Sequence, residues 1–269
     1  MNINNNIASM NTLNQLSKTI FNASQSMEKI SSSQRINKAA DDAAGSAIIS
    51  KMNALVGGYG KAIRNAEDGT SAIQISDGAL NSMHNSLHRM RELALQSSND
   101  TITDNERNMI QAEFAVVSNE IDRIADNTEF NTQKLLDGSF ENKAIHIGAN
   151  SDENITISIG EMSTSGLGLS AVDLSTQAGA NASIGAIDNA INMVSEARGE
   201  LGAFENRLGY SVNNLQVASV NTSAAESRIR DLFTSREIME QIRNEVLMES
   251  TTAMLAHSNN NRQNALGLL

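Results

Sequence analysis

The sequence predicts a mainly α-helical protein, built from long coiled-coil-like rods with one small β-hairpin. A repeat of apolar residues every seven positions between residues 184 and 215 predicts one long helix with an apolar stripe, formed by Ile187, Val194, Leu201, Leu208 and Leu215. The chain of 269 residues has no proline, and proline inside a helix costs about 3 kcal/mol. At 1.5 Å per residue the predicted helix is about 48 Å long, so it needs partner helices rather than one compact core.

Composition narrows the class of protein. The absence of cysteine excludes a disulfide scaffold and thiol chemistry. The net charge is −11, and residues 67–183 carry 6 basic and 18 acidic side chains, which argues against a nucleic-acid partner. No run of about 18 apolar residues is present, so we expect no membrane insertion. The first residues lack a basic region followed by an apolar one, so we expect no cleaved secretory signal.

The two chain ends are amphipathic. Residues 3–30 space their apolar residues by three and four, and the faces between are Asn, Ser, Thr and Gln with few charges. Such a face suits close packing against copies of the same chain, although a single terminal helix on a globular domain is an alternative. The pattern resumes around Ile238, and the chain ends in NALGLL, whose apolar residues are useful only if buried between subunits. The predicted subunit-packing residues are Ile3, Ile7, Met10, Leu13, Leu16, Ile20, Ile242, Val246, Met254, Leu255, Leu266, Leu268 and Leu269.

Two stretches interrupt the helical pattern in the N-terminal part. Asp41 and Asp42 lie in the first, residues 31–47, without a nearby His or third carboxylate, so we expect helix capping and a salt bridge to Arg35 or Lys38 rather than a metal site. The second is the glycine cluster of residues 57–60. It lacks the spacing of a phosphate loop and the Ser or Thr after Lys61, and predicts a flexible turn.

A second long helix is predicted to start near Thr70, after Gly69. It carries two rows of core residues, Ile73, Leu80, Leu87, Ala94 and Ser76, Met83, Met90, which makes it the natural partner of the 184–215 helix. His84 and His88 lie one turn apart on it and could bind a metal. No Glu lies between them as in HExxH and no third ligand is evident, so we favour a solvated pair.

The remaining elements follow in order. A helix is predicted over residues 104–124, and the alternation of Ile145 and Ile147 with Ile155, Ile157 and Ile159 predicts a β-hairpin near 143–160. Residues 160–183, rich in Gly, Ser, Thr and Ala, predict a short exposed connection, whose hydroxyls could carry sugars although such loops usually carry none. The predicted organisation is an N-terminal segment 1–42, a rod domain 43–232 and a C-terminal segment 233–269. Without a nucleophile and base, a metal set or a phosphate loop, we expect neither an enzyme nor a cofactor.

Several runs resemble bacterial flagellins. MEKISSSQRIN (27–37), KAADDAAGSAI (38–48), RNAEDGTSAIQISDGAL (64–80), LHRMRELALQSSN (87–99), IQAEF (110–114) and EIDRIADNTEFNTQKLLDG (120–138) resemble their N-terminal half. LGAFENRLGYSVNNL, SAAESRIRD and AMLAHSNNNRQNALGLL resemble their C-terminal half. The chain departs from similar flagellins at Ser33-Gln34, where they carry Gly-Leu, at Phe233, where they carry an acidic residue, and at Arg262, where they carry Pro. Only about 45 residues separate Gly138 from Ile184, which indicates a minimal form without large outer domains.

The resemblance implies a subunit that self-assembles into the extracellular flagellar filament for motility, with paired chain ends forming an inner coiled coil. It also implies secretion by type III export, and as partners an export chaperone and the cap and hook-junction proteins. The alternative is a hook-filament junction protein of the same paired-end design. Arg89, Leu93, Gln96 and Glu113 match the patch read by the flagellin-sensing Toll-like receptor. The alternative for this patch is that Arg89 is a solvated charge and Leu93 packs against Ile110 or Phe114.

Overall fold

The computed structural model describes residues 6–266, with only the backbone of residues 262 and 264–266. The chain forms two compact units, one made by the chain ends up to residue 55 and from residue 221, the other by residues 56–220. The mainly α-helical class predicted from the sequence is confirmed. Of the helices in the described range, none is both long and apolar enough to cross a bilayer.

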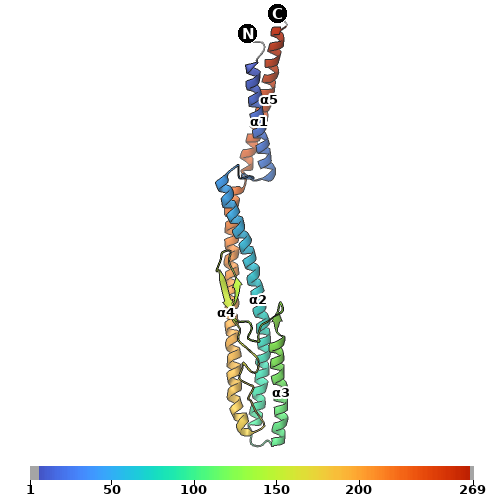
Figure 1. Cartoon of the computed structure of the whole chain (residues 1–269), viewed down its shortest axis with the longest axis vertical. Coiled ribbons are helices and arrows are strands. Elements are labelled where there is room, and N and C mark those ends of the chain that lie inside the picture. Colours follow the sequence, from blue (N-terminus) through green and yellow to red (C-terminus); the bar gives the residue numbers. More distant parts are fainter. Residues whose placement is uncertain (1–5, 267–269) are drawn as a thin grey trace. The chain divides into compact units, whose positions relative to one another are not determined.

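The unit of residues 56–220 is a helical rod. Helices α2 (Ala43–Ser97), α3 (Asp104–Asn127) and α4 (Gln177–Arg230) lie side by side in it (Figure 1). The two predicted rows of α2 and the seven-residue repeat of α4 are buried in its core. Ion pairs Arg91–Asp188 at 2.6 Å and Arg198–Asp77 at 2.8 Å fix α2 antiparallel to α4. The predicted pairing of these two helices is therefore confirmed.

Two antiparallel hairpins complete this unit. Strands β3 (Lys143–His146) and β4 (Asn154–Ile157) form the predicted one, with Ala144 opposite Thr156, and the side chains of Ile155, Ile157 and Ile159 are buried. The second hairpin, β1 (Glu129–Phe130) with β2 (Gln133–Lys134), was not anticipated. Asn131 and Thr132 both have positive φ between these strands, as a tight hairpin turn of the primed type requires.

The prediction of a turn at residues 57–60 is wrong, and so is the predicted helix start at Thr70. Helix α2 begins at Ala43 and continues through Gly57, Gly58, Gly60 and Gly69. Packing explains two of these glycines. A Cβ on Gly58 would lie 2.8 Å from the Cβ of Ala149, and a Cβ on Gly69 would collide with Ile145. The glycines therefore let the hairpin approach the helix backbone.

The prediction of an exposed connection at residues 160–183 is also wrong. Met162, Leu167, Leu169 and Leu174 are buried in the core, because the segment packs its leucines against the helices while its Ser and Thr hydroxyls bond to carboxylates of the segment itself and of α3. Thr164, for example, donates to Asp122 of α3 through its backbone N–H at 2.8 Å and its hydroxyl at 2.9 Å. The last part of the segment, from Gln177, is the first turn of α4.

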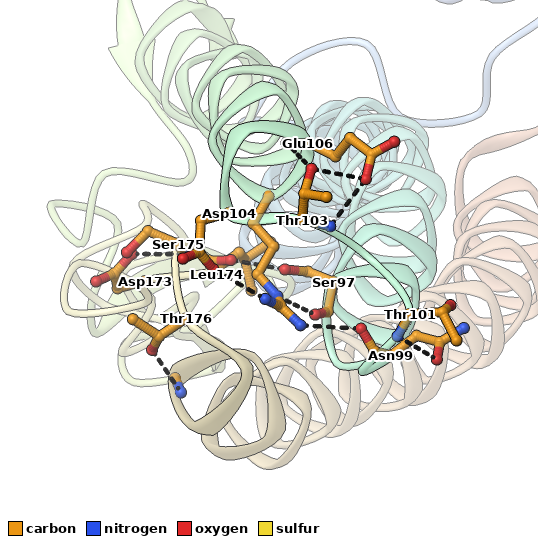
Figure 2. A network of polar contacts seen from close by, with 12 residues as sticks. Ser97, Asn99, Thr101, Thr103, Asp104, Glu106, Asp173, Leu174, Ser175 and Thr176 are labelled. Atoms are coloured by element: carbon orange, nitrogen blue, oxygen red, sulfur yellow. Dashed lines mark hydrogen bonds and ion pairs between the residues drawn. The ribbon is translucent and has the colours of Figure 1, made fainter.

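A polar network holds the turn from α2 to α3 (Figure 2). The buried Arg107 donates to the carbonyl oxygens of Ser97 at 3.0 Å and Asn99 at 2.9 Å, and it pairs with Asp104 at 3.0 Å. The hydroxyl of Ser97 donates to the carbonyl of Leu174 at 2.6 Å. The bond from Arg107 satisfies the Ser97 carbonyl, which the end of α2 leaves without a helical partner, and the Ser97 hydroxyl joins this helix end to the segment before α4.

The unit of the chain ends consists mainly of helices α1 (Ile7–Ser32) and α5 (Thr234–Leu266), which run side by side (Figure 1). Ser33 ends α1 in the left-handed conformation at φ 55°, a conformation that glycine adopts most easily at the end of a helix. The following loop bonds to the end of α4, since Arg35 donates its backbone N–H to Arg230 O at 2.7 Å.

The capping expected of Asp41 and Asp42 is present, but the expected salt bridge is not. Asp42 accepts from the N–H of Gly45 at 2.9 Å, and Asp41 accepts from the backbone N–H groups of Asn37 and Lys38. Lys38 forms its ion pair with Glu28 instead, at 2.6 Å. The two aspartates are thus occupied with backbone donors of the loop, which also lowers the pKa of Asp41.

Candidate functional site

The seam between α1 and α5 is polar. The less exposed side chains along both helices follow a three-four spacing, and they include Ser9, Thr12, Leu16, Thr19, Ala23 and Ser26 on α1 and Gln241, Asn244, Met248, Thr251, Leu255 and Ser258 on α5. Among the described residues of these two helices, only Thr19, Ser26, Gln241 and Asn244 are fully buried. Asn6 donates to Ser258 at 3.2 Å and Ser9 to Asn259 at 3.4 Å, so the start of α1 meets the end of α5 and the helices are antiparallel.

The apolar residues of the same helices face outward. Seven of the predicted packing residues are between 46% and 68% exposed, namely Ile7, Met10, Leu13, Ile20, Ile242, Val246 and Met254. We call this set the outer stripe. Leu16 and Leu255 are half-buried in the seam, while Ile3, Leu268 and Leu269 and the side chain of Leu266 lie outside the described residues. An amphipathic helix pair normally buries its apolar faces together. This pair is inverted, because mostly polar side chains lie between the helices and most apolar side chains face outward.

Sequence reasoning missed part of this surface. Phe21 and Met239 are also more than half exposed, and so is Met27, which continues the apolar spacing of residues 3–30. Phe21 directly follows Ile20, and Met239 directly follows Ile238. The outer apolar surface is therefore wider than one stripe. So many exposed large apolar side chains on two adjacent helices indicate an interaction surface.

The structure corrects the predicted receptor patch. Leu93 is only 1% exposed and belongs to the core that contains Phe114, so it cannot be an outer contact in the folded unit. Arg89, Gln96 and Glu113 remain exposed. The guanidinium of Arg89 donates to Glu113 of α3 at 3.0 and 2.5 Å and to Glu92 at 3.0 Å, and these bonds raise the pKa of Arg89. This surface is therefore a charged cross-link between α2 and α3.

His84 and His88 lie together on α2, with 2.9 Å between their Nε2 atoms. His88 is exposed and His84 is half-buried, and the Nδ1 of His84 is buried with no hydrogen-bond partner among the described residues. Burial lowers the pKa of His84, and the charges of His88 and Arg198 lower it further. No group of three or more His, Cys, Asp or Glu side chains that could hold a metal ion occurs within residues 6–266 outside the masked side chains at the C-terminus.

A helical chain whose paired terminal helices expose their apolar residues is a subunit built to polymerise. Comparison with known proteins identifies the family. Residues 3–141 match the bacterial flagellin N-terminal helical region, and residues 184–269 match the bacterial flagellin C-terminal helical region. The chain belongs to the bacterial flagellin family.

Individual relatives agree with this assignment. The chain is 44% identical over 269 residues to a flagellin of Halalkalibacterium halodurans, covering 99% of each chain. It is 40% identical over 303 residues to a flagellin of Bacillus subtilis, covering the whole of both. The crystal structure of Bacillus cereus flagellin is similar with a TM-score of 0.51 and 30% identity, over 61% of this chain and 94% of that one. Since flagellins are structural proteins, the prediction that the chain is not an enzyme is confirmed.

Proposed function

We propose that the chain is the structural subunit of a bacterial flagellar filament and that the outer stripe drives its polymerisation. The observation that carries this proposal is the inverted α1–α5 pair, polar in its seam and apolar outside. Fully burying one large apolar side chain contributes about 1.5–3 kcal/mol, so each half-exposed residue of the stripe retains about half of that for contacts with other subunits. Seven such residues, repeated at every lattice position, supply a substantial driving force.

The proposed roles of the parts of the chain in the filament follow the predicted segments. Residues 1–42 and 233–269 form the inner coiled-coil layer of the homopolymer, where the outer stripe meets neighbouring copies. Residues 43–232 form the outer layer, and the buried rows shared by α2 and α4 give this layer its rigidity. The hook-filament junction alternative is not favoured, because the full-length relatives at 40–44% identity are flagellins.

The same surface accounts for the further partners. A subunit that exposes the outer stripe before assembly needs it covered during transit, which is the task of an export chaperone on the type III route to the cell exterior. The cap and hook-junction proteins would then present matching helical faces at the two ends of the growing filament. In this proposal the subunit is secreted, and the filament that it forms outside the cell serves motility.

Electron microscopy of purified subunit after nucleation tests the proposal. The full chain is expected to form long tubular filaments, whereas a chain truncated from Glu240 onward, which lacks most of α5, is expected to stay folded and not polymerise. Circular dichroism provides the folding control, since the core of residues 56–220 contains no residue of α5. Filaments of the truncated chain at an unchanged critical concentration would contradict the proposed role of the paired ends.

Recognition by the flagellin-sensing Toll-like receptor is a second function, favoured by the exposed Arg89–Glu113 cross-link. Arg89→Ala is expected to weaken binding of the monomer to the receptor ectodomain by about 1–2 kcal/mol, because interface energy concentrates in a few such residues. Arg91→Ala is the matched control, since Arg91 pairs with Asp188 of α4 instead. Equal binding by both variants and the native chain would remove this surface from consideration.

A further inference from the structure

The histidine pair on α2 has a geometry that its sequence spacing did not reveal. Residues four apart on a helix are neighbours, and here the two rings stand edge to face, at 83° to each other with centroids 4.5 Å apart. The Nε2 atoms are the atoms that converge, at 2.9 Å. The lone pairs that neutral imidazoles use to bind metals therefore lie on the same side of the helix.

This separation is the one that two adjacent metal ligands need. Imidazole nitrogens bind zinc at about 2.0–2.1 Å, so two nitrogens on one ion, about 90–110° apart, stand about 2.9–3.4 Å from each other. An ion can bind between His84 and His88 if both rings turn so that their Nε2 lone pairs point at it instead of at each other. When both Nε2 lone pairs bind the ion, each neutral ring carries its proton on Nδ1, so the ring that donates its Nε2–H in the free pair changes tautomer.

The pair is accessible from solvent on the side of His88. His88 is exposed, so an ion and its water ligands reach the pair from solvent. Arg198, a cation near His84, has its Nε bound to Asp77 at 2.8 Å, and this carboxylate offsets its charge. Met83, Leu87 and Met90 on the same turns of α2 are buried in the core, so the backbone that supports the pair is fixed.

We propose that His84 and His88 form a two-histidine chelate for a divalent transition-metal ion, completed by water. Two imidazoles without carboxylate or thiolate ligands suit borderline ions, and among these the affinity order places copper(II) above nickel(II) and zinc(II). The proposal goes beyond assembly, because it concerns each subunit by itself and adds one exchangeable metal site per chain.

Titration of the native full chain with copper(II), followed by calorimetry and electron paramagnetic resonance, tests the proposal. We expect one tight site per chain with two nitrogen ligands. Loss of an outer-shell partner already weakens metal affinity about 10–100-fold, so His88→Asn, which removes a direct ligand at an exposed position, is expected to weaken it at least about tenfold. His146→Asn and His257→Asn, which alter the remaining two histidines of the chain, are expected to change nothing.

A swap variant gives the sharpest control. Asn85→His combined with His88→Asn keeps four histidines in the chain but places two of them at adjacent positions, which face different directions on a helix. The swap is expected to lose the tight site, as His88→Asn does. If the swap variant binds copper(II) as tightly as the native chain, or if the native chain shows no stoichiometric site, the chelate is refuted. Neither result depends on whether the subunit polymerises.

Discussion

Arg107 is the residue whose replacement we expect to weaken the folded rod most clearly. Its side chain is 8% exposed. The energetic cost of removing the guanidinium differs among its three polar partners, Ser97, Asn99 and Asp104. Ser97 is completely buried, so its carbonyl would be left without a donor, at a cost of about 1–3 kcal/mol. Asn99 is exposed and water can replace the donor to its carbonyl. Asp104 is 88% exposed, and such a pair contributes about 0–1 kcal/mol.

We therefore expect Arg107→Met to lower the free energy of unfolding by about 1–4 kcal/mol, since methionine keeps much of the apolar stem but none of the donors. Urea unfolding of the unassembled chain, followed by circular dichroism, measures the change. The control is Arg123→Met, because Arg123 is 61% exposed and only pairs with Glu120 on its own helix, which is worth about 0.5 kcal/mol or less. A loss for Arg107→Met no larger than that of the control would refute the reasoning.

Two further predictions concern α2 and α3. Gly60→Ala is expected to stabilise the chain by about 0.5–1 kcal/mol, because its Cβ meets no atom within 4 Å in a helix interior, whereas Gly69→Ala is expected to destabilise it by forcing Ile145 aside. Equal melting temperatures for the two variants would contradict this. The N–H and hydroxyl of Thr103 lower the pKa of Glu106 from its ordinary value of 4.5, so the capping box stabilises α3 above that value and loses its effect as the pH falls through the lowered pKa. Glu106→Gln should therefore flatten the acid loss of stability, and an unchanged pH profile of the melting temperature would count against it.

The sequence predicted the helical rods well because their signal is local and repeated. The heptad of Ile187 to Leu215 and the matching row of Ile73 to Ala94 place the same residues in the core that the structure does. The resemblance to flagellins, carried by long runs in both halves of the chain, predicted the family correctly.

The predictions of a turn at residues 57–60 and of an exposed connection at residues 160–183 were wrong because contacts with residues far away in the sequence determine the local structure there. Gly58 and Gly69 suggest a turn locally, but they are small because Ala149 and Ile145 of the hairpin pack against them. The composition of residues 160–183 indicates a surface loop, yet Leu167 and Leu174 anchor the segment in the core, while Ser170 and Asp173 stay exposed.

The candidate site was predicted in part. The apolar spacing of the chain ends indicated self-association. It could not show that Thr19, Ser26, Gln241 and Asn244 occupy the seam, because a polar stripe at the same period resembles an ordinary solvated face. Leu93 was misplaced for the related reason that three and four residue steps along a helix span both its outer and its buried side.

The critical concentration for polymerisation tests the central claim, that the outer stripe drives assembly. Ile20→Gln with Ile242→Gln removes two side chains that are 49% and 54% exposed and keeps good helix formers. At about 0.8–1.5 kcal/mol each, their loss is expected to raise the critical concentration about 15–150-fold without changing the melting temperature of the monomer. The control, Lys18→Gln with Glu249→Gln, alters exposed polar positions of the same helices and is expected to polymerise like the native chain. A critical concentration that is the same for the native chain and the isoleucine variant would contradict the claim.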